Sequence, residues 1–158
     1  MQKTNVMRVL DQRKVPYEAH YYPHSGEAVD AESVAALIGR DIRQVYKTLV
    51  ARGASSACYV FVIPAGRELD LKKAALAVGE KSMAMLHLSE LTPTTGYVRG
   101  GCSPIGMKKQ FPTCLDSSAQ AISHMIVSAG KIGAQVELSP DDLLSLVDGR
   151  YVDLVIED

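Results

Sequence analysis

The chain has 158 residues, 47% of them hydrophobic and 22% charged, with a formal net charge of −1. This length and composition predict one globular domain over residues 1–158 and exclude a disordered chain, and the near-neutral charge excludes a broadly basic surface for nucleic acid. No window approaches about 18 uninterrupted apolar residues, and residues 1–13 lack an apolar signal segment, so we expect no membrane span and no signal peptide. The three cysteines form no CxxC pair, which indicates a reducing, cytoplasmic compartment.

Helix and strand patterns alternate irregularly along the chain. In chain order they predict a helix over residues 5–14, a strand over 17–22, a helix over 31–38, strands over 45–52 and 57–64, a helix over 71–78, strands over 96–100, 113–117, 124–130 and 134–139, a helix over 141–147 and a strand over 151–157. The helices follow the capping residues Thr4, Asp30, Asp70 and Ser139. Because regular βαβ spacing is missing, we predict a mixed α/β fold with a partly closed sheet, not a doubly wound one.

The first candidate for chemistry is Lys47 in the strand-like segment "QVYKTLV". On a strand, Lys47 would share one face with Val45 and Leu49, so its ammonium would be partly desolvated. Such an ammonium binds a phosphate or an acyl oxygen strongly. The alternative is an edge lysine whose apolar stem packs while its ammonium reaches water.

The segment "GGCSPIG", which begins at Gly100, is the second candidate. Gly100 and Gly101 allow positive φ and close approach of another molecule, so their consecutive N–H groups would form a concave anion site, with Pro104 stiffening the exit. The alternative is an ordinary bulge or hairpin turn. Cys102 is a candidate nucleophile with no His or Asp tied to it in sequence, and Ser103 would bond a ligand or cap its own turn.

Three weaker signals remain. His20 and His24 in "HYYPH" form only half of a zinc site, and no further pair completes it, so we expect no metal and no cofactor. Lys108 and Lys109 follow the glycine segment and would either meet an RNA backbone or remain solvated. Ser128 lies in the small-residue segment "VSAGKIG", which is either a pocket wall or a strand-to-strand turn.

Several segments, in this order and spacing, resemble the YbaK family of aminoacyl-tRNA deacylases, a superfamily that includes the editing insertion of bacterial prolyl-tRNA synthetases. They are "VYKTLV", "ELDLKKAA", "TGYVRGGCSPIG", "PTCLD" and "VSAGKIG", and the likeness spans essentially the whole chain. The resemblance implies a mixed, barrel-like β-sheet flanked by short helices. It also implies editing in trans, the removal of a wrong amino acid, typically cysteine, from tRNA(Pro). The expected partner is then the aminoacyl-tRNA acceptor end, with prolyl-tRNA synthetase as a further candidate.

The resemblance also implies roles for single residues. Lys47 matches the family's essential lysine near the phosphate at the tRNA 3′ terminus, and Gly100 matches the glycine whose backbone holds the acyl end. Further pocket positions correspond to Tyr22, Thr48 and Ser128. Gln135 stands where the best-known members carry an aspartate, and "SGEAVDAE" is shorter than their segment and lacks its aromatic residue, so the amino acid specificity stays open.

Three functions are compatible with these residues. The first is a trans-editing deacylase, which needs only to position an activated ester and stabilise negative charge on its carbonyl; the family implies that a cysteine substrate can attack with its own thiol. The second is a non-catalytic tRNA- or nucleotide-binding module, against which the retention of Lys47 and the Gly100–Gly101 pair argues. The third is a thiol enzyme or redox sensor that uses Cys102.

Overall fold

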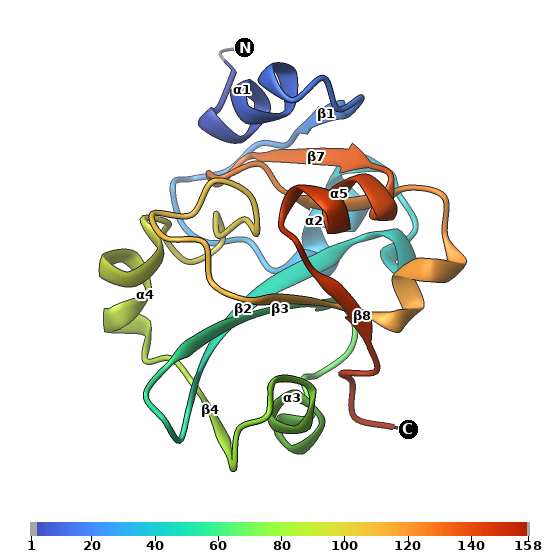
Figure 1. The fold of residues 1–158 in the computed structure, drawn as a ribbon. Helices are drawn as coiled ribbons and strands as arrows, with labels where there is room; N and C mark the ends of the chain where they lie inside the picture. The colour runs from blue at the N-terminus through green and yellow to red at the C-terminus, as the bar shows by residue number, and fades with distance from the viewer. Residues whose placement is uncertain (1–2, 158) are drawn as a thin grey trace.

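The computed structural model describes residues 3–157, which form a mixed α/β fold (Figure 1). The helices are α1 (Asn5–Gln12), α2 (Ala31–Ile38), α3 (Leu71–Val78), α4 (Leu88–Thr95) and α5 (Pro140–Leu146), with 3-10 helices at Ile42–Gln44 and Ser117–Ala121. The strands are β1 (Glu18–Tyr21), β2 (Tyr46–Gly53), β3 (Cys58–Pro64), β4 (Met83–Met85), β5 (Thr113–Asp116), β6 (Met125–Ser128), β7 (Ala134–Leu138) and β8 (Arg150–Val152). None of these helices is long and apolar enough to cross a membrane.

The predicted helix starts are confirmed. Each start could be predicted because it depends on one side chain and the backbone beside it. The four capping side chains accept hydrogen bonds from N–H groups in the first turns of α1, α2, α3 and α5: Thr4 from Met7, Asp30 from Ser33, Asp70 from Lys72 and Lys73, and Ser139 from Asp142. Gly39 (φ 69°) and Gly79 (φ 74°) end α2 and α3 in the left-handed conformation that glycine adopts without strain.

The strands form two open sheets, and the part of the chain described contains no closed barrel. One sheet has the order β1-β7-β6 and is antiparallel, and the other has the order β4-β2-β3-β5-β8, with parallel pairing at β3–β5 and β5–β8. An isolated parallel bridge between Val45 and Ile126 joins them. The predicted barrel-like closure is therefore wrong. The edge strands of the five-stranded sheet, β4 and β8, have only three residues each, and neither pairs with a strand of the other sheet. A barrel needs such pairing between its edge strands.

The chain between β4 and β5 differs from the prediction. Residues 96–100, predicted as a strand, are turn and irregular backbone that follows the unpredicted helix α4. Pro93 and three threonines make α4 a poor helix by intrinsic propensity. Burial of its last residue accompanies local hydrogen bonds at this end: Thr95 is 1% exposed, and its hydroxyl donates to the Leu91 carbonyl at 2.8 Å and accepts from the Tyr97 N–H at 3.0 Å.

Strand β3 is buried on both faces, which explains its unbroken apolar sequence. Val60 and Val62 belong to the core between the two sheets, whereas Phe61 and Ile63 pack with residues of α3 on the opposite face. All four side chains are fully buried. Figure 1 accordingly shows α3 on the side of the five-stranded sheet that faces away from β7.

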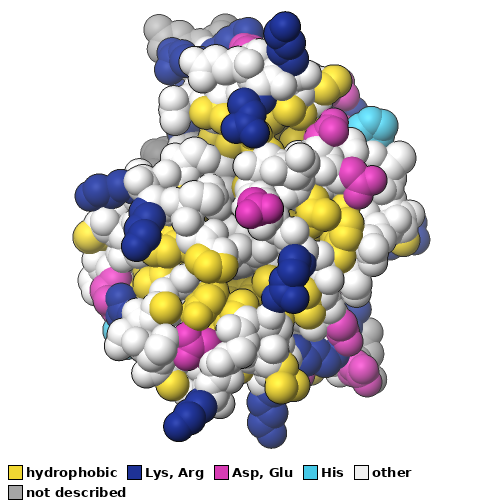
Figure 2. All heavy atoms as spheres, viewed as in Figure 1, with side chains coloured by type: hydrophobic (Ala, Val, Ile, Leu, Met, Phe, Trp, Pro, Cys, Tyr) yellow, Lys and Arg dark blue, Asp and Glu magenta, His cyan; other side chains and the backbone are white. Residues whose placement is uncertain are grey.

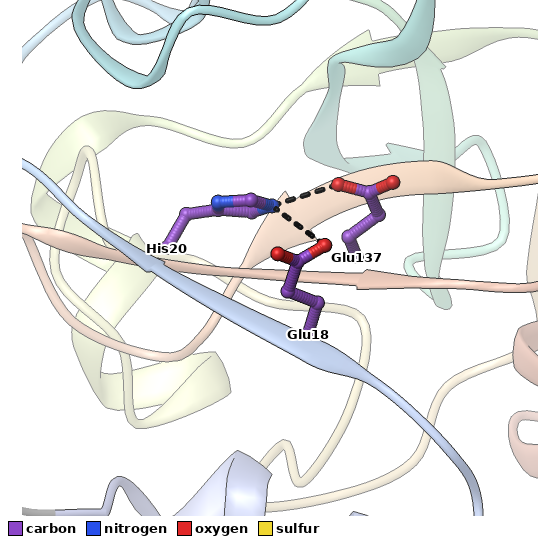
Figure 3. Close-up of side chains that lie close together, drawn as sticks. All are labelled: Glu18, His20 and Glu137. Carbon is purple, nitrogen blue, oxygen red and sulfur yellow. Dashed lines mark hydrogen bonds and ion pairs between the residues drawn. The ribbon is translucent and has the colours of Figure 1, made fainter.

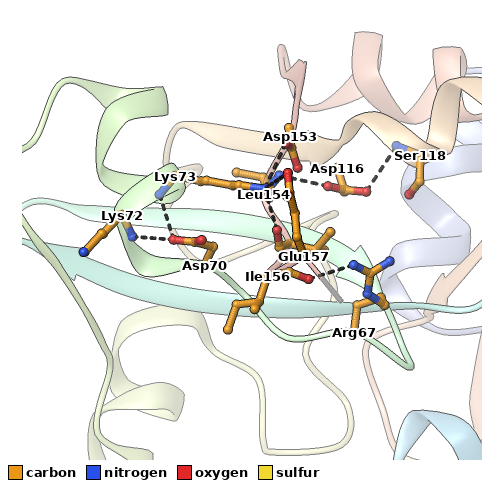
Figure 4. Close-up of polar contacts among 11 residues, drawn as sticks. Arg67, Asp70, Lys72, Lys73, Asp116, Ser118, Asp153, Leu154, Ile156 and Glu157 are labelled. Carbon is orange, nitrogen blue, oxygen red and sulfur yellow. Dashed lines mark hydrogen bonds and ion pairs between the residues drawn. The ribbon is translucent and has the colours of Figure 1, made fainter.

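Polar contacts tie the C-terminal segment to α3 and to the end of β5 (Figure 4). Lys73 Nζ reaches Asp153 Oδ2 at 2.9 Å and the Val155 carbonyl at 2.8 Å. Asp116, which is buried at the end of β5, accepts a hydrogen bond from the Leu154 N–H at 2.9 Å. None of these residues lines the cavity described next, so these contacts hold the fold together at a distance from it.

Candidate active site

A cavity of about 190 Å³ lies where the two sheets approach α2. Its walls come from the start of α2, from β2, from the loop after α4 and from the facing ends of β6 and β7. Five residues predicted from separate parts of the sequence line it together: Lys47, Thr48, Gly100, Ser128 and Gln135. The tertiary structure thus brings half of the ten predicted site residues into one place.

Strand β2 carries Lys47 to the cavity. Tyr46 and Val50 pack in the core between the sheets, and Leu49 packs with the opposite cluster, as the predicted strand alternation requires. Lys47 itself is half-buried, and its ammonium makes no hydrogen bond or ion pair with another residue that the structure describes. An unpaired ammonium in a partly buried wall is suited to bind an anionic group.

Two buried hydroxyl groups have no hydrogen-bond partner among residues 3–157: Tyr22 Oη and Thr48 Oγ1. Thr48 lines the cavity, while Tyr22, which is 5% exposed, is not part of the lining and forms an edge-type ring contact with His24. Leaving a buried hydroxyl unpaired costs about 1–3 kcal/mol. Unpaired buried polar groups call for a functional explanation, and Thr48 is placed to offer its hydroxyl to a ligand.

The glycine segment contributes one open N–H group instead of the predicted pair. Gly100 has φ +84°, lines the cavity and makes no backbone hydrogen bond with another described residue. The Gly101 N–H instead donates to the Val98 carbonyl at 3.0 Å, because the two glycines sit in a tight turn and not in a nest. A Cβ on Gly101 would lie 2.9 Å from Lys131 Cα, so close packing explains this second glycine.

The two side chains after the glycines have different surroundings. Cys102 lines the cavity, and burial raises the pKa of its thiol to about 12, with a weaker opposing effect from Thr95. The thiol is therefore protonated at neutral pH and is a poor nucleophile. Ser103 is fully buried and lies outside the lining, and its Oγ accepts a hydrogen bond from the Ile105 N–H at 3.3 Å. It caps its own turn.

Ser128 and Gln135 face each other across the β6–β7 pair and form the far wall of the cavity. Ser128 Oγ accepts from the Gly130 N–H at 3.2 Å, which leaves its hydroxyl proton for a ligand. Gln135 is 5% exposed, and its amide makes no hydrogen bond with another residue in the described range. The wall thus offers neutral donors and acceptors.

Arg99 is the cavity residue that the sequence did not single out. It lines the cavity beside Gly100, is exposed, and has no ion pair or hydrogen bond to another described residue. Its signal was present, since a basic residue precedes the glycine pair, but the segment was predicted to be a strand. Lys108 and Lys109 are exposed and lie outside the lining, with the ammonium of Lys109 5.7 Å from the centre of the Phe111 ring.

The histidines do not combine into the half zinc site considered from sequence. His20 Nε2 is 2.7 Å from Glu137 Oε1 and 4.0 Å from Glu18 Oε2 (Figure 3), and His24 is not part of this cluster. Arg40 bonds both carboxylates, at 3.1 Å to Glu137 and 3.4 Å to Glu18. Burial would raise the pKa of Glu137, but the bonds from His20 and Arg40 outweigh it and lower the pKa. A guanidinium already neutralises these carboxylates, so the cluster does not suit a cation.

The charge of the cavity defines the class of ligand. Its lining contains Lys47 and Arg99 and no carboxylate, while Figure 2 shows basic and acidic side chains interspersed over the face seen there, without a continuous basic patch. The lining itself is therefore positively charged, which suits a small anionic group. Fold and cavity together define a mixed α/β domain with a small, positively charged cavity whose far wall is lined by polar side chains.

Comparison with known proteins identifies the family. Residues 25–146 match the aminoacyl-tRNA editing domain, and the chain belongs to this family. A protein of Enterococcus faecalis named as a candidate Cys-tRNA(Pro)/Cys-tRNA(Cys) deacylase, EbsC, is 51% identical over 157 residues, which are 99% of this chain and 96% of that protein.

Two crystal structures show the same fold. One, of a candidate trans-editing enzyme for prolyl-tRNA synthetase, has a TM-score of 0.83 at 24% identity and covers 99% of this chain and 100% of that one. The other, of the hypothetical protein APE2540, has a TM-score of 0.87 at 19% identity and covers 97% of this chain and 100% of that one.

Proposed function

We propose that the chain is a trans-editing deacylase that removes a mischarged small amino acid, above all cysteine, from tRNA(Pro). Membership of the aminoacyl-tRNA editing domain family and the name of the 51%-identical relative support this function, and that name adds tRNA(Cys) as a second substrate. The observation that carries the proposal is the cavity itself, in which Lys47, Gly100 and Gln135 meet from three distant segments.

The two cations fit the acceptor end of a tRNA. Lys47 and Arg99 are both unpaired and both line the cavity, so a phosphate near the 3′-terminal nucleotide would satisfy them together. The pairing also orients the ester, because the phosphate fixes the terminal ribose at one side of the cavity. We assign Lys47 the central contact, since it is half-buried, and Arg99 a supporting contact at the exposed rim.

The ester carbonyl would then lie against the Gly100 N–H. When water attacks the carbonyl carbon, its oxygen becomes negative, and an N–H already in place stabilises that charge. Collapse of the intermediate breaks the bond between the carbonyl carbon and the ribose oxygen, which takes up a proton and leaves the free amino acid. With cysteine, its own sulfur can form the new bond to the carbonyl carbon, giving a thiolactone that water opens later.

The size and polarity of the pocket support selection of small side chains. Thr48, Ser128 and Gln135 supply hydroxyl and amide groups, and the volume of about 190 Å³ leaves little room beyond the ester itself. A small pocket rejects large side chains by steric exclusion but separates small ones by only about 1–3 kcal/mol. We therefore expect some cleavage of serine and alanine esters beside cysteine.

The structure gives no support to a thiol enzyme or redox sensor. Such a function needs a thiolate, whereas burial raises the pKa of Cys102 to about 12. In the proposed mechanism the sulfur of Cys102 forms no bond and only packs at the edge of the cavity.

A panel of aminoacylated tRNAs tests the proposal. Purified protein is incubated with tRNA(Pro) and tRNA(Cys) that carry cysteine, serine, alanine or proline, and the loss of each ester is timed against the uncatalysed rate. We expect the fastest loss from Cys-tRNA(Pro) and little from Pro-tRNA(Pro). If no small aminoacyl ester is lost at micromolar enzyme, the proposed function is wrong.

A further inference from the structure

We propose that the cavity takes the aminoacyl ester with its α-amine uncharged, and that the same site therefore cleaves α-hydroxyacyl esters of tRNA. The inference rests on the proposed function and concerns the class of acyl group that this site accepts. It follows from the signs of the charges around the cavity.

The lining contains two unpaired cations, Lys47 and Arg99, and no carboxylate. A substrate with a free amine would add a third positive charge to this partly buried space. Both desolvation and the like charges disfavour the ammonium form and favour the neutral amine. An α-amino group has a pKa of about 7.7–8.0 in peptides, so the neutral form is accessible near neutral pH.

Two acidic side chains that lie close in sequence to lining residues form hydrogen bonds of their own. Glu137 follows Gln135 on the same face of β7, but its carboxylate bonds His20 and Arg40 (Figure 3). Asp30 caps α2 through the Ser33 N–H and hydroxyl, and these bonds lower its pKa.

Glu27 lines a neighbouring cleft together with Arg99 and Gly100, outside the cavity lining. Asp30 lines the same cleft but is held by the cap of α2, so Glu27 is the acidic group of this cleft whose contribution the experiment must exclude.

The remaining titratable groups of the lining supply no negative charge either. Burial raises the pKa of the Cys102 thiol to about 12. Burial also raises the pKa of Tyr46, against a weaker effect of its hydrogen bond with Ser118 at 2.8 Å. Both groups are neutral at the pH of the assay, so they leave the cavity net positive.

Gln135 is the residue that decides which α-substituent is accepted. Gln135 is 5% exposed and its amide has no partner within the described residues, so its oxygen can accept from a neutral amine or from a hydroxyl, and its NH₂ can donate to either. A carboxylate of the same shape at this position would offer an ammonium a counter-charge. The change Gln135→Glu is thus a test of charge at nearly constant volume.

The experiment compares two esters that differ only at the α-position. One is cysteinyl-tRNA(Pro), and the other is its α-hydroxy counterpart, 2-hydroxy-3-sulfanylpropanoyl-tRNA(Pro); the thiol, the ester and the bond cleaved are the same. The ratio of kcat/KM for cysteinyl over hydroxy ester is measured from pH 6 to pH 8, after subtraction of uncatalysed loss. Titration of a protein group that acts on both esters cancels in this ratio.

In the wild type we expect both esters to be cleaved and the ratio to rise at least about tenfold over this range, as the substrate amine loses its proton. Gln135→Glu should raise the ratio at pH 6 about tenfold and flatten its rise. Gln12→Glu, a matched change on the exposed face of α1, and Glu27→Gln should both leave the ratio unchanged.

Several outcomes would overturn the inference. A wild-type ratio that is constant with pH, or no cleavage of the hydroxy ester while the cysteinyl ester is cleaved, overturns it and leaves the proposed function standing. If Glu27→Gln changes the ratio, the Glu27 carboxylate contacts the substrate amine, and this outcome also overturns the inference. If Gln135→Glu is inactive on both esters, the wild-type profile decides. Wild type that cleaves neither ester overturns the proposed function itself.

Discussion

Replacing Gly100 by alanine perturbs the backbone and the proposed chemistry at one position. Gly100 has φ +84°, where a residue with a Cβ is strained by about 1–2 kcal/mol. The new Cβ would lie 2.8 Å from Ala28 Cβ and 2.9 Å from Ala28 Cα, and neither atom can rotate away. We therefore expect the free energy of unfolding to fall by about 1–3 kcal/mol. For a chain of this size, each kcal/mol lowers Tm by about 2–4 °C.

The loss of activity should be larger than the loss of stability. Relief of the clash moves the Gly100 N–H away from the carbonyl, and removal of one oxyanion donor costs about 10²–10³-fold in kcat. The assay is single-turnover loss of the ester from Cys-tRNA(Pro), run beside thermal melts. Gly79→Ala is the matched control: Gly79 has φ +74° at the end of α3, and its Cβ would meet no atom within 4 Å.

The control should lose stability through strain alone and keep its deacylation rate. The reasoning fails if Gly100→Ala cleaves the ester at the wild-type rate while its Tm falls as much as that of Gly79→Ala. The Gly100 backbone would then not contact the acyl group. A failure of Gly79→Ala to deacylate would show that strain at a distance, and not the N–H, limits the reaction.

Four further changes have distinct readouts. Lys47→Ala should lower kcat/KM about ten- to a hundred-fold, because a charge-assisted contact contributes about 1.5–3 kcal/mol. Lys47→Arg should not reach the wild-type kcat/KM, because a planar guanidinium replaces a compact ammonium. Wild-type turnover in Lys47→Ala would contradict the assigned role of Lys47. For tRNA binding, Arg99→Ala should make the slope of log K against log salt less steep by about 0.7–0.9, from a shallow wild-type slope of a few units. An unchanged slope would show that Arg99 does not contact a phosphate. Cys102→Ala should keep most of the deacylation rate, and an inactive variant would instead support a mechanism that uses the Cys102 thiol. Glu137→Gln should lower the free energy of unfolding by about 1.5–3 kcal/mol at pH 7. Because the folded state lowers the pKa of Glu137 below its ordinary 4.5, this difference should vanish as pH falls through the folded pKa, and a constant difference in denaturant melts would refute it.

Local interactions explain why much of the fold could be predicted. Asp70 caps α3 with its own side chain, and Gly79 ends the helix with its own backbone, so a few neighbouring residues suffice for the prediction. The apolar run in β3 predicts a buried strand in the same way. Helix α4 could not be predicted, because Pro93 argues against a helix and the burial of Thr95, which is 1% exposed, depends on tertiary packing. The barrel-like sheet was wrong for a related reason, since closure depends on how the edge strands meet.

The sequence by itself predicted that Lys47 lies on a strand and that Gly100 can adopt the positive φ that residues with a Cβ avoid. Both follow from alternation and from backbone sterics, which act over a few residues. Only the tertiary structure decided that Gly100, but not Gly101, offers its N–H, and that Arg99 joins Lys47 at the cavity. It also decided that no carboxylate from another segment lines the cavity beside Gln135. Hydrogen bonding and net charge in a cavity depend on segments far apart in the chain, and folding alone sets which of them meet.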